Sequence, residues 1–166
     1  ELTKEKIAWK HLFKPEDEVY DFQTTDKEMY VYTPKGAPNF KILKTSVMNP
    51  DLGTAEVVVP EDPHRKITSY GITSDGLYYT LSENGVVGKF LFLPHGEKSG
   101  KEIELPFSAG AVYVGTKGFR FSDTWIYMMG WTNDFQRYRY TPQKNEFTLE
   151  NLSSTAEYPE FADLIV

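Results

Sequence analysis

Residues 73–87 read T-S-D-G-L-Y-Y-T-L-S-E-N-G-V-V and decide the fold, because they join two turn signals through one apolar strand. Asp75-Gly76 and Asn84-Gly85 are strong hairpin signals, since both central positions of such turns favour a positive φ. The segment between them, residues 77–81, is apolar or aromatic on both of its faces. This pattern predicts a strand that is covered from both sides.

The same unit occurs upstream and downstream. Asp75 lies 49 residues after Asp26 and 48 residues before Asp123, and each Asp leads into a similar strand. Segments of matching character then begin at residues 41, 89 and 137, a spacing of 48 in both cases. A repeat of this period indicates a supersecondary unit that cannot bury its own faces alone. The predicted strands are 19–24, 28–33, 40–47 and 55–59, then 67–72, 77–81, 87–93 and 101–105, and finally 111–115, 125–130, 136–141 and 146–149.

Four antiparallel strands in each repeat, covered on both faces, are typical of a β-propeller blade. The sequence therefore predicts an all-β chain, a partial β-propeller of about three four-stranded antiparallel blades. We expect residues 1–166 to form a single propeller segment with repeats at about 15–61, 64–108 and 109–152. The first 18 residues are expected to hold the end of a preceding strand and a connection, and residues 153–166 a tail that leads to an absent domain. A large β-sandwich is the alternative, although three blades are too few to close a propeller ring.

Composition excludes several classes of protein. With 18 basic and 24 acidic residues the net charge is -6, and no basic stripe is present, so nucleic acid is not an expected partner. The absence of cysteine excludes disulfides, zinc–thiolate sites and a cysteine nucleophile. No apolar run approaches the roughly 20 residues that span a bilayer, so we expect no membrane association. The compartment stays open, with a soluble location in the cytoplasm or periplasm expected.

The residues that could carry chemistry do not form a recognisable catalytic pattern. Ser74 lies near two glycines, but it follows the first by three residues and falls in a hairpin rather than at a strand-to-helix turn. His11, His64 and His95 all fall in predicted connections, where solvated histidines are expected. Asp21 is the only carboxylate on a predicted inner strand, and glycoside hydrolysis requires two. We therefore expect no catalytic, cofactor-binding or metal-binding residue in this chain.

Two short motifs also have simpler interpretations. Residues 96–101, G-E-K-S-G-K, resemble a phosphate-binding loop, but the glycines are one residue too close and Glu102 replaces the required Ser or Thr. Asn151-Leu152-Ser153 is a glycosylation sequon that matters only in a secreted eukaryotic protein.

Aromatic residues concentrate in the strands expected to be most buried. We predict that they pack between blades rather than form a sugar or peptide platform. Trp131 and Arg137, at a hairpin end, are the better candidates for contact with something outside the blade. The expected packing residues are Tyr30, Tyr32, Tyr78, Tyr79, Trp125 and Tyr127.

Three further segments are distinctive: A-P-N-F-K-I at 37–42, V-V-V-P-E at 57–61, and G-W-T at 130–132 leading to R-Y-R-Y at 137–140. Together they resemble the propeller of the prolyl oligopeptidase family of serine peptidases, and its later blades most strongly. The resemblance covers most of residues 13–152. Relatives often carry a Ser-x-Pro-like turn in the last blade, where this sequence has N-D-F-Q at 133–136.

The resemblance implies a non-catalytic domain that caps the active site of an α/β-hydrolase domain and admits only short peptides. The nucleophile elbow, Asp and His of that domain are absent from this chain. The expected partners are the hydrolase domain and short peptide substrates, with self-association through exposed blade faces. The alternatives are an interaction propeller that binds a protein or glycan on one rim and, less favoured, a glycoside hydrolase propeller.

Overall fold

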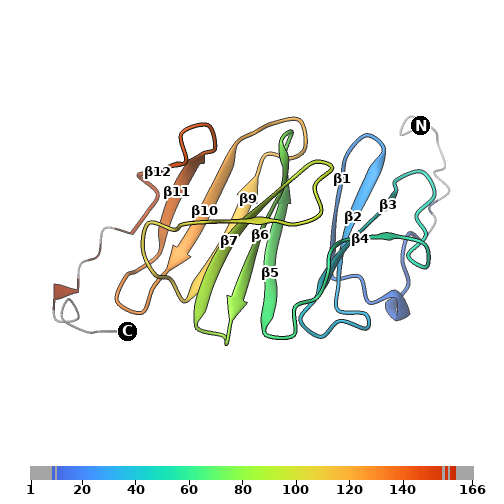
Figure 1. The fold of residues 1–166 in the computed structure, drawn as a ribbon, viewed down its shortest axis with the longest axis horizontal. Coiled ribbons are helices and arrows are strands. Elements are labelled where there is room, and N and C mark those ends of the chain that lie inside the picture. Colours follow the sequence, from blue (N-terminus) through green and yellow to red (C-terminus); the bar gives the residue numbers. More distant parts are fainter. Residues whose placement is uncertain (1–8, 10, 155, 157, 160–166) are drawn as a thin grey trace.

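The computed structural model describes residues 9, 11–154, 156 and 158–159 and is built almost entirely of β-strands (Figure 1). One 3₁₀ turn, Pro15–Asp17, precedes them. The strands form three four-stranded sheets, each in the order of the chain. The first sheet holds β1 (Asp21–Thr24), β2 (Glu28–Thr33), β3 (Lys41–Ser46) and β4 (Glu56–Val59); the second holds β5 (Arg65–Ile72), β6 (Gly76–Glu83), β7 (Val87–Pro94) and β8 (Lys101–Ile103); the third holds β9 (Ala111–Thr116), β10 (Thr124–Met129), β11 (Gln136–Thr141) and β12 (Glu146–Leu149).

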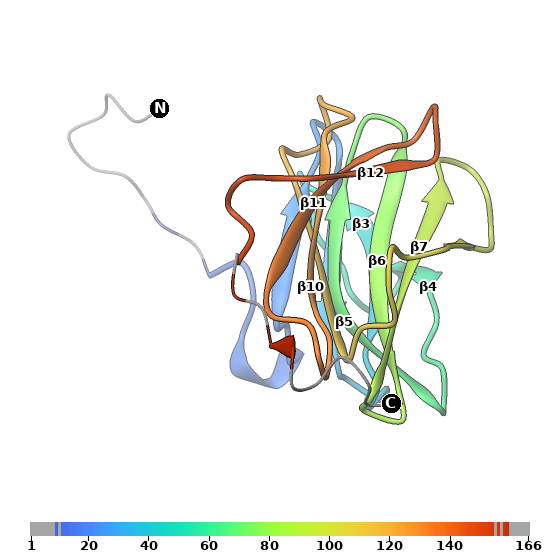
Figure 2. The same ribbon diagram turned by 90° about the vertical axis from the view of Figure 1, so that its left-hand side faces the viewer.

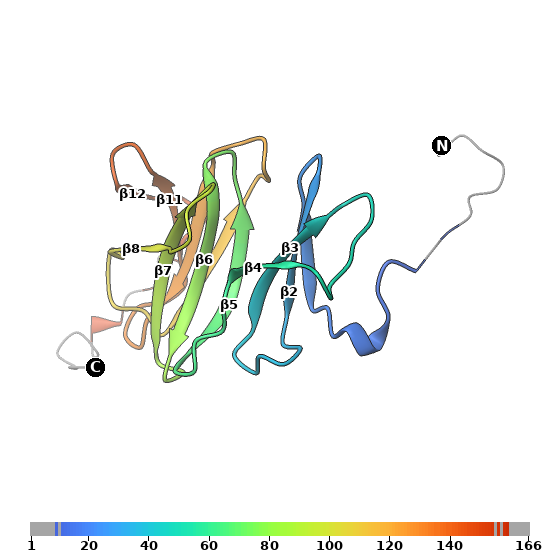
Figure 3. The same ribbon diagram turned by 45° about the vertical axis from the view of Figure 1, so that its right-hand side comes forward.

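The three sheets lie side by side and face to face in chain order, as blades do (Figures 1 and 3). We call them blade 1 (β1–β4), blade 2 (β5–β8) and blade 3 (β9–β12). Every strand pair is antiparallel and joins neighbours in the chain. Two buried clusters lie between successive blades rather than in one shared interior. The predicted fold class, a partial propeller of three four-stranded blades, is confirmed, and the sandwich alternative is wrong.

The central strand β6 is buried on both faces, as its sequence predicts. Its second turn is also as expected, because Asn84 and Gly85 have φ values of 52° and 75° and the Val86 amide donates to the Glu83 carbonyl. The first turn differs by one residue from the prediction.

Ser74 and Asp75, not Asp75 and Gly76, form the centre of this first turn. The amide of Thr73 donates to the carbonyl of Gly76 at 2.8 Å, and Gly76 already pairs with Pro94 as the first residue of β6. A Cβ at position 76 would collide with the Leu93 carbonyl. The glycine is therefore required by the close approach of β7 rather than by the turn.

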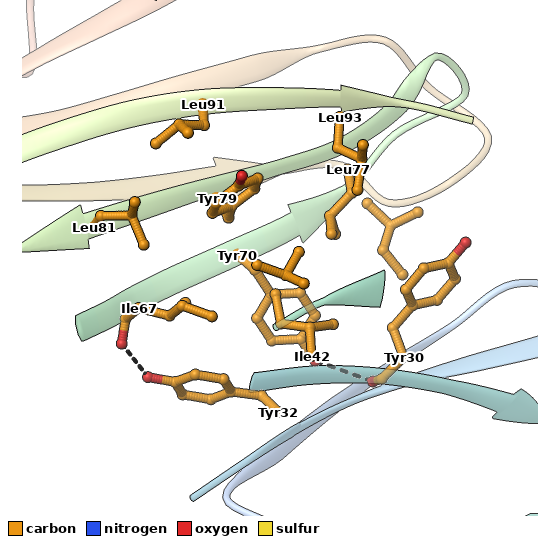
Figure 4. Packing of buried hydrophobic residues seen from close by; sticks show 12 residues of the cluster. Tyr30, Tyr32, Ile42, Ile67, Tyr70, Leu77, Tyr79, Leu81, Leu91 and Leu93 are labelled. Carbon is orange, nitrogen blue, oxygen red and sulfur yellow. Dashed lines mark hydrogen bonds between the residues drawn. The ribbon is translucent and has the colours of Figure 1, made fainter. Parts of the chain in front are cut away.

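Tyrosines dominate the junction between blades 1 and 2 (Figure 4). The Tyr32 hydroxyl donates to the Ile67 carbonyl, and the Tyr70 hydroxyl donates to the Tyr30 carbonyl at 3.2 Å. Tyr79 of β6 is buried in the same cluster. These rings therefore fill the junction and also satisfy backbone groups across it.

Close backbone approach characterises the junction between blades 2 and 3. A Cβ on Gly71 would collide with Thr116, and one on Gly88 would collide with the Val112 side chain. The Gly88 amide donates to the Ala109 carbonyl at 2.7 Å. The cluster at this junction holds Tyr78, Phe90, Ile103, Ala109, Val112, Val114, Ile126, Met128 and Tyr140.

The two ends of the arc differ. The outer face of blade 1 carries Met29, Val31 and Leu43, and it is covered by side chains of the segment before β1 and of the β3–β4 connection. The outer face of blade 3 carries Trp125, Tyr127 and Met129, and Met129 is half exposed. Figure 2 views the arc from this side.

The interpretation of the aromatic residues therefore needs one correction. Tyr30, Tyr32, Tyr78 and Tyr79 pack between blades as expected. Trp125 and Tyr127 do not, because side chains alternate along β10 and Ile126 and Met128 take the positions that face blade 2. Among the described residues, no blade covers the face that they occupy.

Residues 1–8 and 10, where the end of a preceding strand is expected, lie outside the described residues. The same holds for residues 155, 157 and 160–166 of the predicted tail. Within the described chain, no helix is long and apolar enough to cross a bilayer.

Candidate functional site

The first strands of the three blades run next to one another and form the inner side of the arc. The Gln23 side chain on β1 bridges to β5, because its Nε2 donates to the Tyr70 carbonyl and its Oε1 accepts from the Ile72 amide, both at 3.1 Å. On the other side of β5, the Ser69 hydroxyl accepts a hydrogen bond from the Val114 amide of β9 at 2.8 Å. Side chains thus join β1 to β5 and β5 to β9.

A groove of about 480 Å³ crosses these three strands. The side chains along it include an amide, hydroxyls and apolar groups, and Lys117 is the one ionised residue. Its Nζ lies 3.5 Å from Asp123 and 5.5 Å from the ring centre of Trp125. The lining residues are Gln23, Thr24, Tyr70, Ile72, Val114, Gly115, Thr116, Lys117, Gly118 and Phe119.

Tyr70 is the largest polar side chain at this groove. Burial raises the pKa of its hydroxyl above the ordinary value, and the nearby Asp21 carboxylate raises the pKa further. The hydroxyl therefore stays protonated and serves as a donor to Tyr30 rather than as a base. Asp21 itself is exposed at the start of β1, the strand where the sequence places a single carboxylate.

The loop of residues 117–123 between β9 and β10 bridges all three blades, and we call it the strap. Arg120 of the strap pairs with Asp26 in the β1–β2 turn of blade 1 at 2.7 Å. The Phe121 carbonyl accepts a hydrogen bond from the Ser74 amide of blade 2 at 2.9 Å, and Phe119 packs against the cluster between blades 1 and 2. The strap therefore fastens the inner ends of the blades together.

The strap replaces a turn that the other two repeats share. In those repeats, the amides of Thr25 and Thr73 donate to the carbonyls of Glu28 and Gly76, and each Thr hydroxyl accepts from the amide three residues on. The equivalent position 48 residues further on is Phe121, which has no hydroxyl. This missing Thr is the one sequence signal that could have identified the strap.

Ser74, Asp75 and His95 lie close together but do not form a catalytic relay. The Ser74 hydroxyl donates to the Asp75 carboxylate at 2.9 Å, while the His95 Nε2 interacts with the Thr73 carbonyl at 3.2 Å. A nucleophilic serine instead requires a hydrogen bond to its histidine base. In the part of the chain that the structure describes, no bond joins Ser74 to His95.

The other candidates occupy the surface. His11, His64 and His95 are all exposed and lie in connections. Trp131 is exposed in the β10–β11 loop, and its contact with a partner outside the blade stays a prediction. Arg137 is held within blade 3, where its Nε lies 2.9 Å from Glu150 and its guanidinium stacks over Trp125 and Tyr127. Within residues 11–154, no group of three or more His, Asp or Glu side chains is placed to hold a metal ion.

The arrangement of blades and inner strands agrees with a match to a known family. Residues 1–127 match the family model of the prolyl oligopeptidase N-terminal β-propeller domain. The chain belongs to this family. A comparison with curated protein sequences found no match.

Solved structures show the same propeller fold. A prolyl endopeptidase, from a study of inter-domain dynamics in catalysis and specificity, is 17% identical, with a TM-score of 0.65 over 79% of this chain and 19% of its own. Prolyl oligopeptidase B from Galerina marginata, bound to a 25mer macrocyclization substrate, is 13% identical, with a TM-score of 0.61 over 78% of this chain and 18% of its own. Oligopeptidase B from Leishmania major is 16% identical, with a TM-score of 0.60 over 78% of this chain and 20% of its own. This chain thus spans about a fifth of the length of these relatives.

Proposed function

We propose that this chain is part of the non-catalytic propeller of a prolyl oligopeptidase-like serine endopeptidase. In this role it caps the active site of a separate α/β-hydrolase domain and admits only short peptides. The observation that carries the proposal is the family match over residues 1–127. The inner groove supports it, because its amide, hydroxyl and apolar side chains offer contacts to a passing peptide without a nucleophile–base pair.

One solved relative supports a role in the interplay of two domains, because the study of two prolyl endopeptidases concerns inter-domain dynamics in catalysis and specificity. The Galerina marginata enzyme is bound to a 25mer, so we expect the length limit of such a filter to differ among relatives. We assign the three blade repeats to about residues 15–61, 64–108 and 109–152, and we assign residues 153–166 to the link with the hydrolase domain.

The strap offers a physical basis for filtering. It joins the inner ends of the blades, so releasing it allows the inner side of the arc to widen. The Arg120–Asp26 pair is solvent-exposed on both sides, with side chains 68% and 65% exposed, and is therefore weak and sensitive to salt. A contact of this strength can open without unfolding the blades.

The test compares two peptides with the same cleavage site, one of about five and one of about thirty residues, in the longer protein that contains this chain. Arg120→Ala should raise kcat/KM for the long peptide relative to the short one, because it releases the strap. Lys89→Ala is the control, since Lys89 pairs with Glu102 inside blade 2 at 2.9 Å and does not contact the strap. An unchanged ratio in Arg120→Ala would contradict the filtering role.

We also propose that the isolated chain self-associates through the outer face of blade 3. The outer face of blade 1 is covered by its own chain, whereas Met129 is 50% exposed on the opposite end. Light scattering should show a mass that rises with concentration, and Met129→Lys should restore a monomer. A monodisperse monomer of the unmodified chain would contradict this proposal.

The second candidate function is an interaction propeller that binds a partner on its rim. It is favoured by a groove between blade 1 and the loop that follows β7, where Glu28, Glu56 and Glu97 outnumber two lysines. The sequence that follows Val166 discriminates the two, because a peptidase continues into a hydrolase with a G-x-S-x-G motif. An interaction protein continues into further blades.

A further inference from the structure

The outermost strands of the three blades leave their free edges exposed to different degrees. β8 has only three residues, K-E-I, and begins with two charges, a pattern that protects an edge from pairing. β12 reads E-F-T-L. β4 reads E-V-V-V, and Val57 within it is 51% exposed. Three successive β-branched residues make β4 the edge best suited to pair with another strand.

No described segment uses the free edge of β4. Its one strand neighbour is β3, and in the described chain residues 56–59 make no backbone hydrogen bond outside that pairing. Figure 3 shows β4 at the end of its sheet, beyond β3. The backbone groups along this edge are thus available to an added strand.

A groove of about 710 Å³ runs beside this edge, between blade 1 and the loop that follows β7. Glu56, Val57 and Val58 line it in succession. Glu56 pairs with Lys44, and Lys44 with Tyr30, so the groove covers the face of blade 1 that meets blade 2 and reaches the edge strand β4 at Val57 and Val58. Its volume is within the range of small-ligand and peptide sites.

Charge defines the occupant of this groove. Glu28, Glu56 and Glu97 line it against two lysines, Lys44 and Lys98. Lys44 already pairs with Glu56 at 2.9 Å and with Glu28 at 3.6 Å, and the Glu56 hydrogen bond raises the pKa of Lys44. Lys44 thus lies between Glu28 and Glu56, and Glu56, whose side chain is 65% exposed, remains open to a second cation from the free edge of β4.

We propose that β4 and this groove bind an extended basic peptide segment, which adds to the sheet as a strand next to β4 and places a Lys or Arg side chain beside Glu56. The strand supplies main-chain hydrogen bonds, and the Glu56 carboxylate selects the side chain. A second copy of this chain is a poor occupant of this edge, because pairing of two β4 strands would bring two Glu56 carboxylates and two copies of the same groove together. The peptide site lies on the outer rim and does not depend on the peptidase assignment.

The test uses a fluorescein-labelled peptide of alternating Val and Lys, six residues long, titrated with the 166-residue chain and followed by fluorescence anisotropy. The alternating Val and Glu peptide of the same length is the control probe. We expect saturable binding of the basic peptide, weakened by salt, and no binding of the acidic one. In NMR spectra of the labelled chain, the peptide-induced changes in amide chemical shift should concentrate at Val57 and Val59.

Two variants locate the site. Glu56→Gln should weaken binding about tenfold, because it removes a charge-assisted contact. Glu146→Gln is the matched control, since Glu146 opens the edge strand β12 as Glu56 opens β4. Val57→Lys, at an exposed position that tolerates the change, should abolish binding by placing a cation on the edge.

Several outcomes would overturn the proposal. They are the absence of saturable binding, equal binding of the acidic peptide, and a loss of affinity in Glu146→Gln as large as that in Glu56→Gln. A concentration-dependent mass that Val57→Lys removes would instead assign this edge to pairing between two copies. Circular dichroism of each variant verifies that the fold is kept.

Discussion

The two junctions between blades, 1 with 2 and 2 with 3, involve equivalent strands but differ in how their residues pack. In the first, Tyr32 and Tyr70 reach across and bind backbone carbonyls of the opposite blade. In the second, Gly71 and Gly88 allow the backbones to approach, and the Tyr78 hydroxyl is buried without a hydrogen-bond partner among the described residues. The first junction therefore relies on tyrosine hydroxyls that reach across the gap, and the second on close approach of the backbones.

Hydroxyl groups of shorter side chains also provide polar contacts at the second junction. The Thr80 hydroxyl lies 2.7 Å from both the Thr68 and the Ser69 hydroxyls. Thr68 also donates to the Val112 carbonyl at 3.3 Å, and Ser69 accepts from the Val114 amide. An irregularity in β5 between Ile67 and Ser69 leaves Thr68 without a partner on β6, so two adjacent hydroxyls reach Thr80.

The largest expected loss of stability comes from a substitution that disrupts the second junction. Phe90 is fully buried there and packs edge-on against Tyr140 at 5.6 Å. Phe90→Ala should lower the free energy of unfolding by about 3–5 kcal/mol, because it removes a large apolar side chain and leaves a cavity. Urea unfolding measures the change. Phe135→Ala is the control, since Phe135 is 40% exposed on the outer face of blade 3 and should cost far less.

A smaller loss of stability tests the close approach of the backbones at the second junction. Gly88→Ala should destabilise the chain by about 1–3 kcal/mol, because the added Cβ collides with Val112. Gly53→Ala should have little effect or stabilise slightly, since its nearest contact is the flexible Asp51 carboxylate at 3.3 Å. Equal effects of the two substitutions would contradict the account of the second junction.

The smallest effect sharpens the contrast between the junctions. Tyr70→Phe should cost about 1–2 kcal/mol, because it leaves the buried Tyr30 carbonyl without its donor. Tyr78→Phe should be neutral or stabilising, because it removes a hydroxyl that is buried without a partner. Urea unfolding of both variants under one condition measures the difference. A loss in Tyr78→Phe as large as that in Tyr70→Phe would indicate that a buried water satisfies Tyr78.

Much of the fold follows from local signals in the sequence. The 48-residue repeat, the apolar and aromatic runs and the turn chemistry predicted each of the strands, and Asn84-Gly85 adopts the positive φ values that its turn requires. Gly76 was assigned to the wrong role, because the steric demand comes from Leu93 on β7 and is not visible in the local sequence. The orientation of Trp125 and Tyr127 depends on which face of β10 meets blade 2, a choice that Ile126 and Met128 determine.

The site was less accessible to sequence reasoning than the fold. The inner groove depends on Gln23, whose side-chain amide bonds to the backbone of β5. Its partner there, Tyr70, lies 47 residues further along the sequence. The strap depends on a pairing of Arg120 with Asp26 across 94 residues. Neither contact has a local pattern, because both arise only when the blades are stacked.

The most direct test of the central claim, that this chain is a propeller segment without reaction chemistry, is the hydrolysis of a proline-containing chromogenic peptide by the purified chain. The account predicts no turnover above buffer, because Ser74 lacks a histidine partner among the described residues. Turnover that a serine-directed inhibitor abolishes, and that Ser74→Ala also removes, would contradict it.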